Sequence, residues 1–182
     1  MEDYLKIIKE FNGIIGAVVG STTTLVITKL LKSTGKVCLY LKEWEVENTE
    51  ENEIGEINYI KTTSLEVDSL YIKLTMDIYN SSEIPKIMRN IKIGFYNNKK
   101  ELFSIVPNDK DNEFKGQQFN FPQKSTIINL ESKKCIIKKF SFNISDKNVI
   151  DLLKNANVIY FMYTNENNKN KKFPMRKNII NE

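Results

Sequence analysis

Apolar and polar residues alternate along much of the chain after residue 35, and this alternation predicts β-strands. Between residues 70 and 78 every second position is apolar, while lysine, threonine, aspartate and tyrosine occupy the positions between. A period of two is typical of a strand with one buried face and one face in water. We therefore expect a strand here, with Leu74 in the core.

Shorter runs of the same kind predict further strands. The expected strands cover residues 36–46, 91–95, 102–106, 126–130, 140–144 and 158–163. Asn97 and Asn98 stand between two of these runs, and asparagine tolerates the left-handed backbone of a tight hairpin turn. Phe142 occupies an apolar position of its strand, so we expect it to be buried.

A single short helix is expected among these strands. Ser145 or Asp146 can cap a turn that continues through Val149, Leu152 and Leu153. Several short strands, frequent turn signals and one connecting helix predict a mainly β domain over residues 35–182. The expected fold is an antiparallel immunoglobulin-like β-sandwich, with a small β-barrel as the alternative.

The N-terminal part, residues 1–34, has a different pattern. Residues 13–31 read GIIGAVVGSTTTLVITKLL, with Lys29 as the one charge. As a helix this stretch would measure about 28 Å, close to the hydrocarbon thickness of a bilayer. It predicts a transmembrane anchor. A cleaved signal peptide would need a basic start and a small-residue cleavage site, and a buried soluble helix would need a partner covering nearly every side.

Small residues recur on one face of this predicted helix. Gly16, Gly20, Thr24 and Thr28 follow each other at intervals of four residues. This spacing lets two membrane helices approach closely. We therefore interpret the four residues as a candidate helix-packing stripe, through which the chain would form a homo-oligomer.

The lysines that flank the segment bear on its orientation. Lys29, Lys32 and Lys36 lie toward or after its end, and Lys6 and Lys9 precede it. Because lysines next to a span favour the cytoplasmic side, the pattern predicts a single-pass protein of the cell membrane whose domain faces the cytoplasm.

Three segments carry a resemblance to known proteins. They are the span rich in glycine and alanine, the Gly35–Lys36 entry into the first strand, and NSSEIPKIMRNIKIGFYN at residues 80–97. Together they resemble small uncharacterised membrane-anchored β-sandwich proteins of low-GC Firmicutes and their phages. The resemblance implies the anchor and the fold, and it implies no activity.

The charge distribution argues against a nucleic-acid partner. The chain has 27 basic and 23 acidic residues, a formal net charge of +4, and acids and bases interspersed over most of its length. Nucleic-acid binders usually gather their cations on one face. One dense basic run occurs near the C-terminus, and we interpret it as a solvated hairpin or tail: Lys169, Lys171, Lys172, Arg176 and Lys177.

The chain contains no histidine, which removes the commonest general base and zinc ligand. The stretch GAVVGST at residues 16–22 lacks the lysine of a phosphate-binding loop. We therefore expect no catalytic residues, no cofactor and no enzymatic activity. Cys38 and Cys135 are too few for a disulfide framework, and we expect both to be reduced and to lie on strands.

Two acidic segments are candidate sites. Residues 108–113 have the spacing of a calcium loop but lack its glycine, and Asn120 stands where the bidentate glutamate belongs. We therefore expect no metal site there. The stretch from Glu43 to Glu56 is interpreted as a solvated loop between strands.

The segment from Asn80 to Arg89 is the most distinctive loop. Asn80, Ser81 and Ser82 follow the long alternating run, and Pro85 stiffens the connection before Arg89. Loops on a rigid scaffold often bind partners, so Asn80, Ser81, Ser82 and Arg89 form a candidate partner loop. Alternatively, the asparagine and serines stabilise the turn backbone.

Three functions fit these patterns. The first is a membrane-tethered, non-enzymatic module that binds another protein through edge strands or loops. The second is a small membrane effector in phage–host conflict that oligomerises through its helix. The third is contact of the C-terminal lysines with anionic lipid. The bilayer and another protein are thus the expected partners.

Overall fold

The computed structural model describes residues 2–51, 54, 57–115 and 120–180 of the chain. The elements are, in chain order, α1 (Glu2–Ser33), β1 (Val37–Glu51), β2 (Ile57–Lys61), β3 (Leu70–Asn80), β4 (Lys86–Asn97), β5 (Lys100–Ile105), β6 (Asn108–Lys115), β7 (Asn120–Lys124), β8 (Ile127–Leu130), β9 (Cys135–Ile144), α2 (Lys147–Leu153), β10 (Val158–Thr164) and β11 (Asn170–Arg176).

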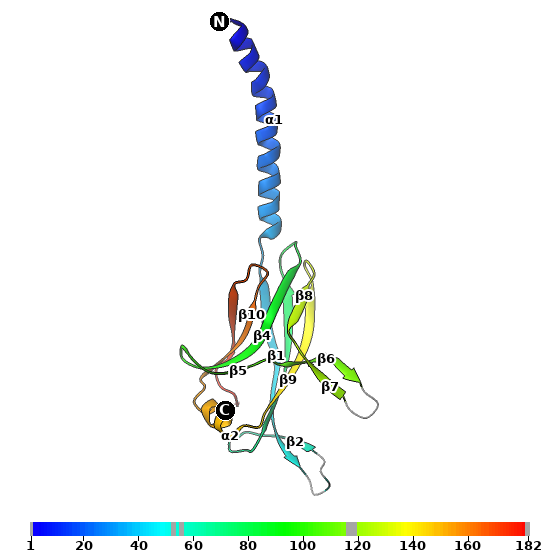
Figure 1. Ribbon diagram of the computed structural model, residues 1–182, viewed down its shortest axis with the longest axis vertical. Coiled ribbons are helices and arrows are strands. Elements are labelled where there is room, and N and C mark those ends of the chain that lie inside the picture. Colours follow the sequence, from blue (N-terminus) through cyan, green and yellow to red (C-terminus); the bar gives the residue numbers. More distant parts are fainter. Residues whose placement is uncertain (1, 52–53, 55–56, 116–119, 181–182) are drawn as a thin grey trace.

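The strands form two antiparallel sheets. One sheet has the order β2-β1-β3-β9-β6-β7, and the other has the order β11-β10-β4-β5, with β8 also paired to β4. Figure 1 shows the two sheets below α1, with α2 at the far end of the sandwich. The prediction of a mainly β, antiparallel β-sandwich is confirmed.

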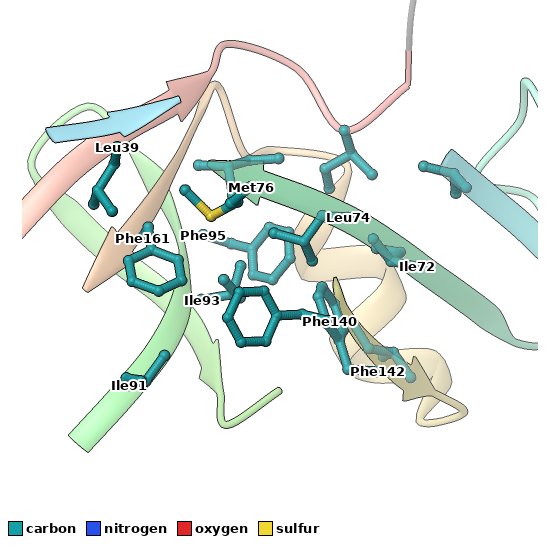
Figure 2. Close-up of a cluster of buried hydrophobic side chains, with 14 of the residues drawn as sticks. Leu39, Ile72, Leu74, Met76, Ile91, Ile93, Phe95, Phe140, Phe142 and Phe161 are labelled. Carbon is teal, nitrogen blue, oxygen red and sulfur yellow. The ribbon is translucent and has the colours of Figure 1, made fainter. Parts of the chain in front are cut away.

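The core lies between the two sheets, and its residues come from the alternating runs. On β3 every second residue is buried, and Leu74 opposes Phe140 while Ile72 opposes Phe142 on β9. Figure 2 shows phenylalanines from both sheets meeting among these aliphatic side chains. Leu74 and Phe142 are each 1% exposed, so their expected burial is confirmed.

Two local predictions are also confirmed. Asn98 has a φ of 54° in the turn between β4 and β5, a conformation that asparagine adopts more readily than most residues. The Asp146 side chain accepts a hydrogen bond from the Asn148 backbone N–H at the start of α2. This bond satisfies one of the N–H groups that a helix start leaves without a partner.

The interpretation of Glu43–Glu56 as a loop is wrong for most of its length. β1 continues to Glu51 and pairs with β2 and β3, while residues 52–53 and 55–56 lie outside the described part. The acidic side chains occupy the outer face, where Lys61 pairs with Glu45 at 2.9 Å and Lys73 with Glu47 at 2.7 Å. Lysines on the neighbouring strands thus offset the repulsion between the glutamates of β1.

The candidate calcium loop is a strand. β6 begins at Asn108, and its register with β7 shifts between Asp109 and Phe114. Asp109 is 4% exposed and is bound by Lys138 Nζ at 2.8 Å. The lysine ammonium group therefore pairs with the carboxylate that a metal ion would need. No cluster of three metal-ligating side chains occurs in the described part of the chain.

α1 confirms the predicted N-terminal helix. It projects away from the sandwich, continuing its long axis (Figure 1), and every described side chain from residue 11 to residue 30 is exposed. The hydroxyls of Thr22 and Thr24 return to the carbonyls of Val18 and Gly20. Within the described residues, none of the helices combines the length and the apolar character needed to cross a membrane.

Candidate functional site

The predicted partner loop forms a cluster of hydrogen bonds at the end of the sandwich that carries α1. Asn80 is fully buried, and its Nδ2 donates to the carbonyls of Ile84, Leu130 and Glu131. Its Oδ1 accepts from the backbone N–H of Ser82 at 3.0 Å and from the Ser82 hydroxyl. The two buried side chains therefore hold the turn at residues 80–84 against the end of β8.

Ser81 connects the same hydrogen-bond cluster to the segment that follows α1. Its hydroxyl donates to the Lys36 carbonyl and accepts from the Lys36 N–H, both at 2.9 Å. Gly35 has a φ of +126°, and a Cβ there would lie 2.6 Å from the Ser82 Cα. Glycine is required here because both the conformation and the space exclude a side chain.

Arg89 lies apart from this hydrogen-bond cluster. Its Nη2 donates to Asn168 Oδ1 at 2.8 Å in the turn between β10 and β11. The structure thus brings Asn80, Ser81 and Ser82 together and directs Arg89 to another turn. Asn80 and Ser82 stabilise the fold, as the architectural alternative expects, and partner binding at this loop stays a prediction.

The candidate helix-packing stripe lies on the exposed helix. A Cβ added at Gly16 or Gly20 would meet nothing within 4 Å, and Thr24 and Thr28 are exposed. The stripe is available for a second helix, and its use stays a prediction.

A groove that the sequence did not predict crosses the outer face of the β11-β10-β4-β5 sheet. Its volume is about 590 Å³, and we call it the Tyr96 groove. It is lined by Asn90, Ile91, Lys92, Tyr96, Glu101, Ser104, Val106, Thr126, Met162, Tyr163, Thr164, Asn170, Lys171 and Lys172.

Tyr96 organises the groove. It is 3% exposed although it lies on the outer face of β4, because neighbouring strands cover it. Its hydroxyl donates to the Glu101 carboxylate on β5 and accepts from Lys172 Nζ on β11 at 2.7 Å. The ring of Tyr160 meets it edge-on with centroids 5.1 Å apart. Three strands thus contribute one polar cluster.

The cluster shifts the pKa values of its members in directions that preserve it. Burial raises the pKa of Tyr96, and its hydrogen bond to Glu101 raises it further. The hydrogen bond from Tyr96 lowers the pKa of Glu101, and that to Tyr96 raises the pKa of Lys172. At neutral pH the tyrosine is therefore a neutral donor between a carboxylate and an ammonium group.

Gly94 makes room for this arrangement. A Cβ at Gly94 would lie 2.7 Å from Met162 Cε and 2.8 Å from Tyr96 Cε2, so both side chains fold over the bare backbone. A glycine inside a strand marks such a close approach. This glycine was the one sequence signal of the groove.

The lining of the groove offers cationic groups that can bind anions. Lys92, Lys171 and Lys172 line it, whereas Glu101 is the one carboxylate in the lining and already binds Tyr96. A tyrosine whose pKa is raised is not activated as a nucleophile. The remaining lining offers hydroxyl and amide groups that donate and accept hydrogen bonds.

The C-terminal basic run contributes to this groove. Its position in a hairpin is as predicted, because Lys171 and Lys172 lie on β11, which pairs with β10. Lys172 is exposed, as expected, although it also binds Tyr96, whereas Arg176 is only partly exposed and lies 5.4 Å from the ring of Trp44. Burial lowers the pKa of Arg176.

Cys38 and Cys135 are both free and lie on β1 and β9, as expected of strand-borne cysteines. Each lies opposite Tyr79 of the strand between them.

Comparison with known proteins agrees with this fold. Residues 35–176 match the model of the YopI Ig-like domain family. Over 170 residues the chain is 31% identical to the SPbeta prophage-derived uncharacterized protein YopI of Bacillus subtilis (strain 168). The aligned region covers 93% of this chain and 95% of that protein. The resemblance to small phage-related Ig-like proteins is confirmed, and its membrane anchor stays a prediction.

Proposed function

The chain belongs to the YopI Ig-like domain family, and from this premise we propose that it is a non-enzymatic binding module tethered to a membrane. In this proposal α1 is the tether, and the Tyr96 groove holds an acidic segment of a partner protein.

The observation that carries the binding function is the charge of the groove. Three lysines line it, and the single lining carboxylate, Glu101, accepts a hydrogen bond from the Tyr96 hydroxyl. A cleft of one charge sign attracts ligands of the opposite sign and raises their association rate. An acidic peptide segment would pair with Lys92 and Lys171, while Asn90, Ser104 and Asn170 would bind its backbone.

The tether is supported by the exposed apolar surface of α1. Val18, Leu25 and Leu30 are 58%, 71% and 59% exposed, and Ile14 on the first half of the helix is 61% exposed. Apolar side chains on several sides of a free helix favour an apolar environment. The side chains of Ile15 and Leu31, at the ends of the predicted span, lie outside the described residues.

We propose that the sandwich faces the cytoplasm. Lys29 lies near the end of the apolar segment, and Lys32 and Lys36 lie between that segment and the sandwich. Such lysines are retained on the cytoplasmic side. Both cysteines are free, as is usual in a reducing compartment.

A peptide-binding measurement tests the groove. The probe is a short fluorescent oligoglutamate, titrated with the full-length protein in detergent. Changing Lys92 and Lys171 together to Glu should weaken binding by about tenfold or more, equal to about 1.4 kcal/mol. The matched control changes two exposed lysines outside the groove, Lys99 and Lys124. Equal losses in both double variants would show that net charge, not the groove, binds the probe.

The effector function is a second candidate, favoured by the bare face at Gly16 and Gly20. In that case α1 helices would assemble through the stripe and perturb the bilayer. Expression would then collapse the membrane potential, and Gly16→Leu with Gly20→Leu would abolish the collapse. An unchanged potential on expression would reject this candidate.

A further inference from the structure

The outer face of the six-stranded sheet carries an exposed apolar patch near α1. Tyr40 on β1 and Ile137 on β9 are 56% and 63% exposed, and they lie on either side of Asp77 of β3. Lys42 neutralises Asp77 at 3.0 Å. This level of the sheet therefore presents two large, exposed apolar side chains, one on each side of a neutralised aspartate.

The neighbouring level of the same face carries opposite charges. Glu43 of β1 and Lys139 of β9 both lie opposite Thr75 of β3, one on each side of it. Both side chains are exposed, and Thr75 donates to Glu43 Oε2 at 2.8 Å. The acid therefore lies on one side of β3 and the base on the other.

We propose that this face joins two copies of the chain about a two-fold axis parallel to β3. Such an axis brings β1 of one copy over β9 of the other. Glu43 then faces Lys139 of the second copy, and the same pair forms again by symmetry. Tyr40 faces Ile137 of the second copy, so the apolar patch covers itself.

The order of the charges fits a second copy of the chain as the occupant. A two-fold interface must be complementary to itself, and a face with its acid and base on opposite sides of one strand satisfies this condition. The axis also keeps both α1 helices at the same end, because α1 continues the long axis of the sandwich (Figure 1). Both tethers could then enter one membrane.

The inference goes beyond the proposed binding function and does not depend on it. The Tyr96 groove lies on the outer face of the other sheet, so it stays open in both copies. A dimer would present two grooves that point away from each other, and such a pair favours multivalent partners.

A charge exchange tests the interface with the full-length protein in detergent. Glu43→Lys and Lys139→Glu should each weaken dimerisation about tenfold, measured by light scattering over a dilution series. The double variant restores opposite charges and should dimerise within about threefold of the original chain. A monomeric original chain, or a double variant no better than the single ones, would overturn the proposal.

The cysteines test the direction of the axis. The axis brings Cys38 over Cys135 of the second copy, because both lie opposite Tyr79 on the two flanking strands. Chains with Cys38→Ser and chains with Cys135→Ser are expressed together and treated with a short bismaleimide. Covalent dimers should form in the mixture and not with either variant alone. Equal dimer yields in all three samples would contradict this axis.

Discussion

Lys172 Nζ lies 2.7 Å from the hydroxyl of Tyr96 and 4.3 Å from the centroid of its ring. The ammonium group thus both donates a hydrogen bond to the phenol and lies over the face of its ring. This contact ties β11, an edge strand, to β4 across β10. The groove therefore depends on the C-terminal hairpin being in place.

Gly94→Ala should disrupt this cluster. The new methyl group would lie 2.7 Å from Met162 Cε, and overpacking of this kind costs about 1–3 kcal/mol. Urea unfolding measures the loss. Gly13→Ala is the matched control, because a Cβ there meets nothing within 4 Å. Equal stabilities of the two variants would show that Gly94 is not needed for the packing.

Asn80→Ala should destabilise the sandwich by about 2–3 kcal/mol. It removes the donor to three carbonyls in a buried place, and unsatisfied buried groups are costly. The control is Asn129→Ala, at an exposed position of β8, which should cost less than about 0.5 kcal/mol. A negligible loss for Asn80→Ala would favour a partner-binding role over an architectural one.

The stability of the sandwich should depend on Glu101 at acid pH. The hydrogen bond from Tyr96 lowers the pKa of Glu101 below its ordinary value of 4.5. A carboxyl with a lowered pKa contributes stability above pH 4.5 and loses it as the pH falls through the folded-state value. The unfolding free energy of Glu101→Gln should therefore fall less steeply below pH 4.5 than that of the original chain. Parallel curves would contradict the hydrogen bond.

The fold was largely predictable because β3 and β9 bury one face and expose the other to water, which produces the alternating sequence pattern. The groove was not, because its residues come from strands with weak patterns. β11 reads NKKFPMR, where Pro174 removes a backbone donor and is acceptable at a sheet edge. Glu101 and Lys172 are distant in sequence from each other, and pairing of β4 with both β5 and β10 brings them to Tyr96.

β6 shows a second reason why pattern alone failed. Its residues are almost all polar, and its register shift places Asp109 in a buried position. Lys138 on β9 satisfies that carboxylate. A buried ion pair between strands leaves no apolar period for a sequence to reveal.

The tether predicts how the full-length protein fractionates. Membranes washed with alkaline carbonate should retain it, because carbonate removes proteins held by charge and leaves inserted helices in place. A variant with Val18, Leu25 and Ile27 changed to Ser should be released, since the exposed apolar side chains of α1 are lost. Protease added outside intact protoplasts should leave the sandwich uncut. Release of the original chain by carbonate would reject the tether.

Site-specific photocross-linking in cells reports directly what occupies the Tyr96 groove. A photoreactive phenylalanine analogue replaces Thr126, an exposed residue of the groove lining, or Asp151, an exposed residue of α2 outside it. We expect a light-dependent adduct with another protein from position 126 and not from position 151. That adduct should disappear when Lys92 and Lys171 are changed to Glu. An adduct at position 126 that persists in the charge-reversed chain, or the same adduct from both positions, would contradict an acidic partner in this groove.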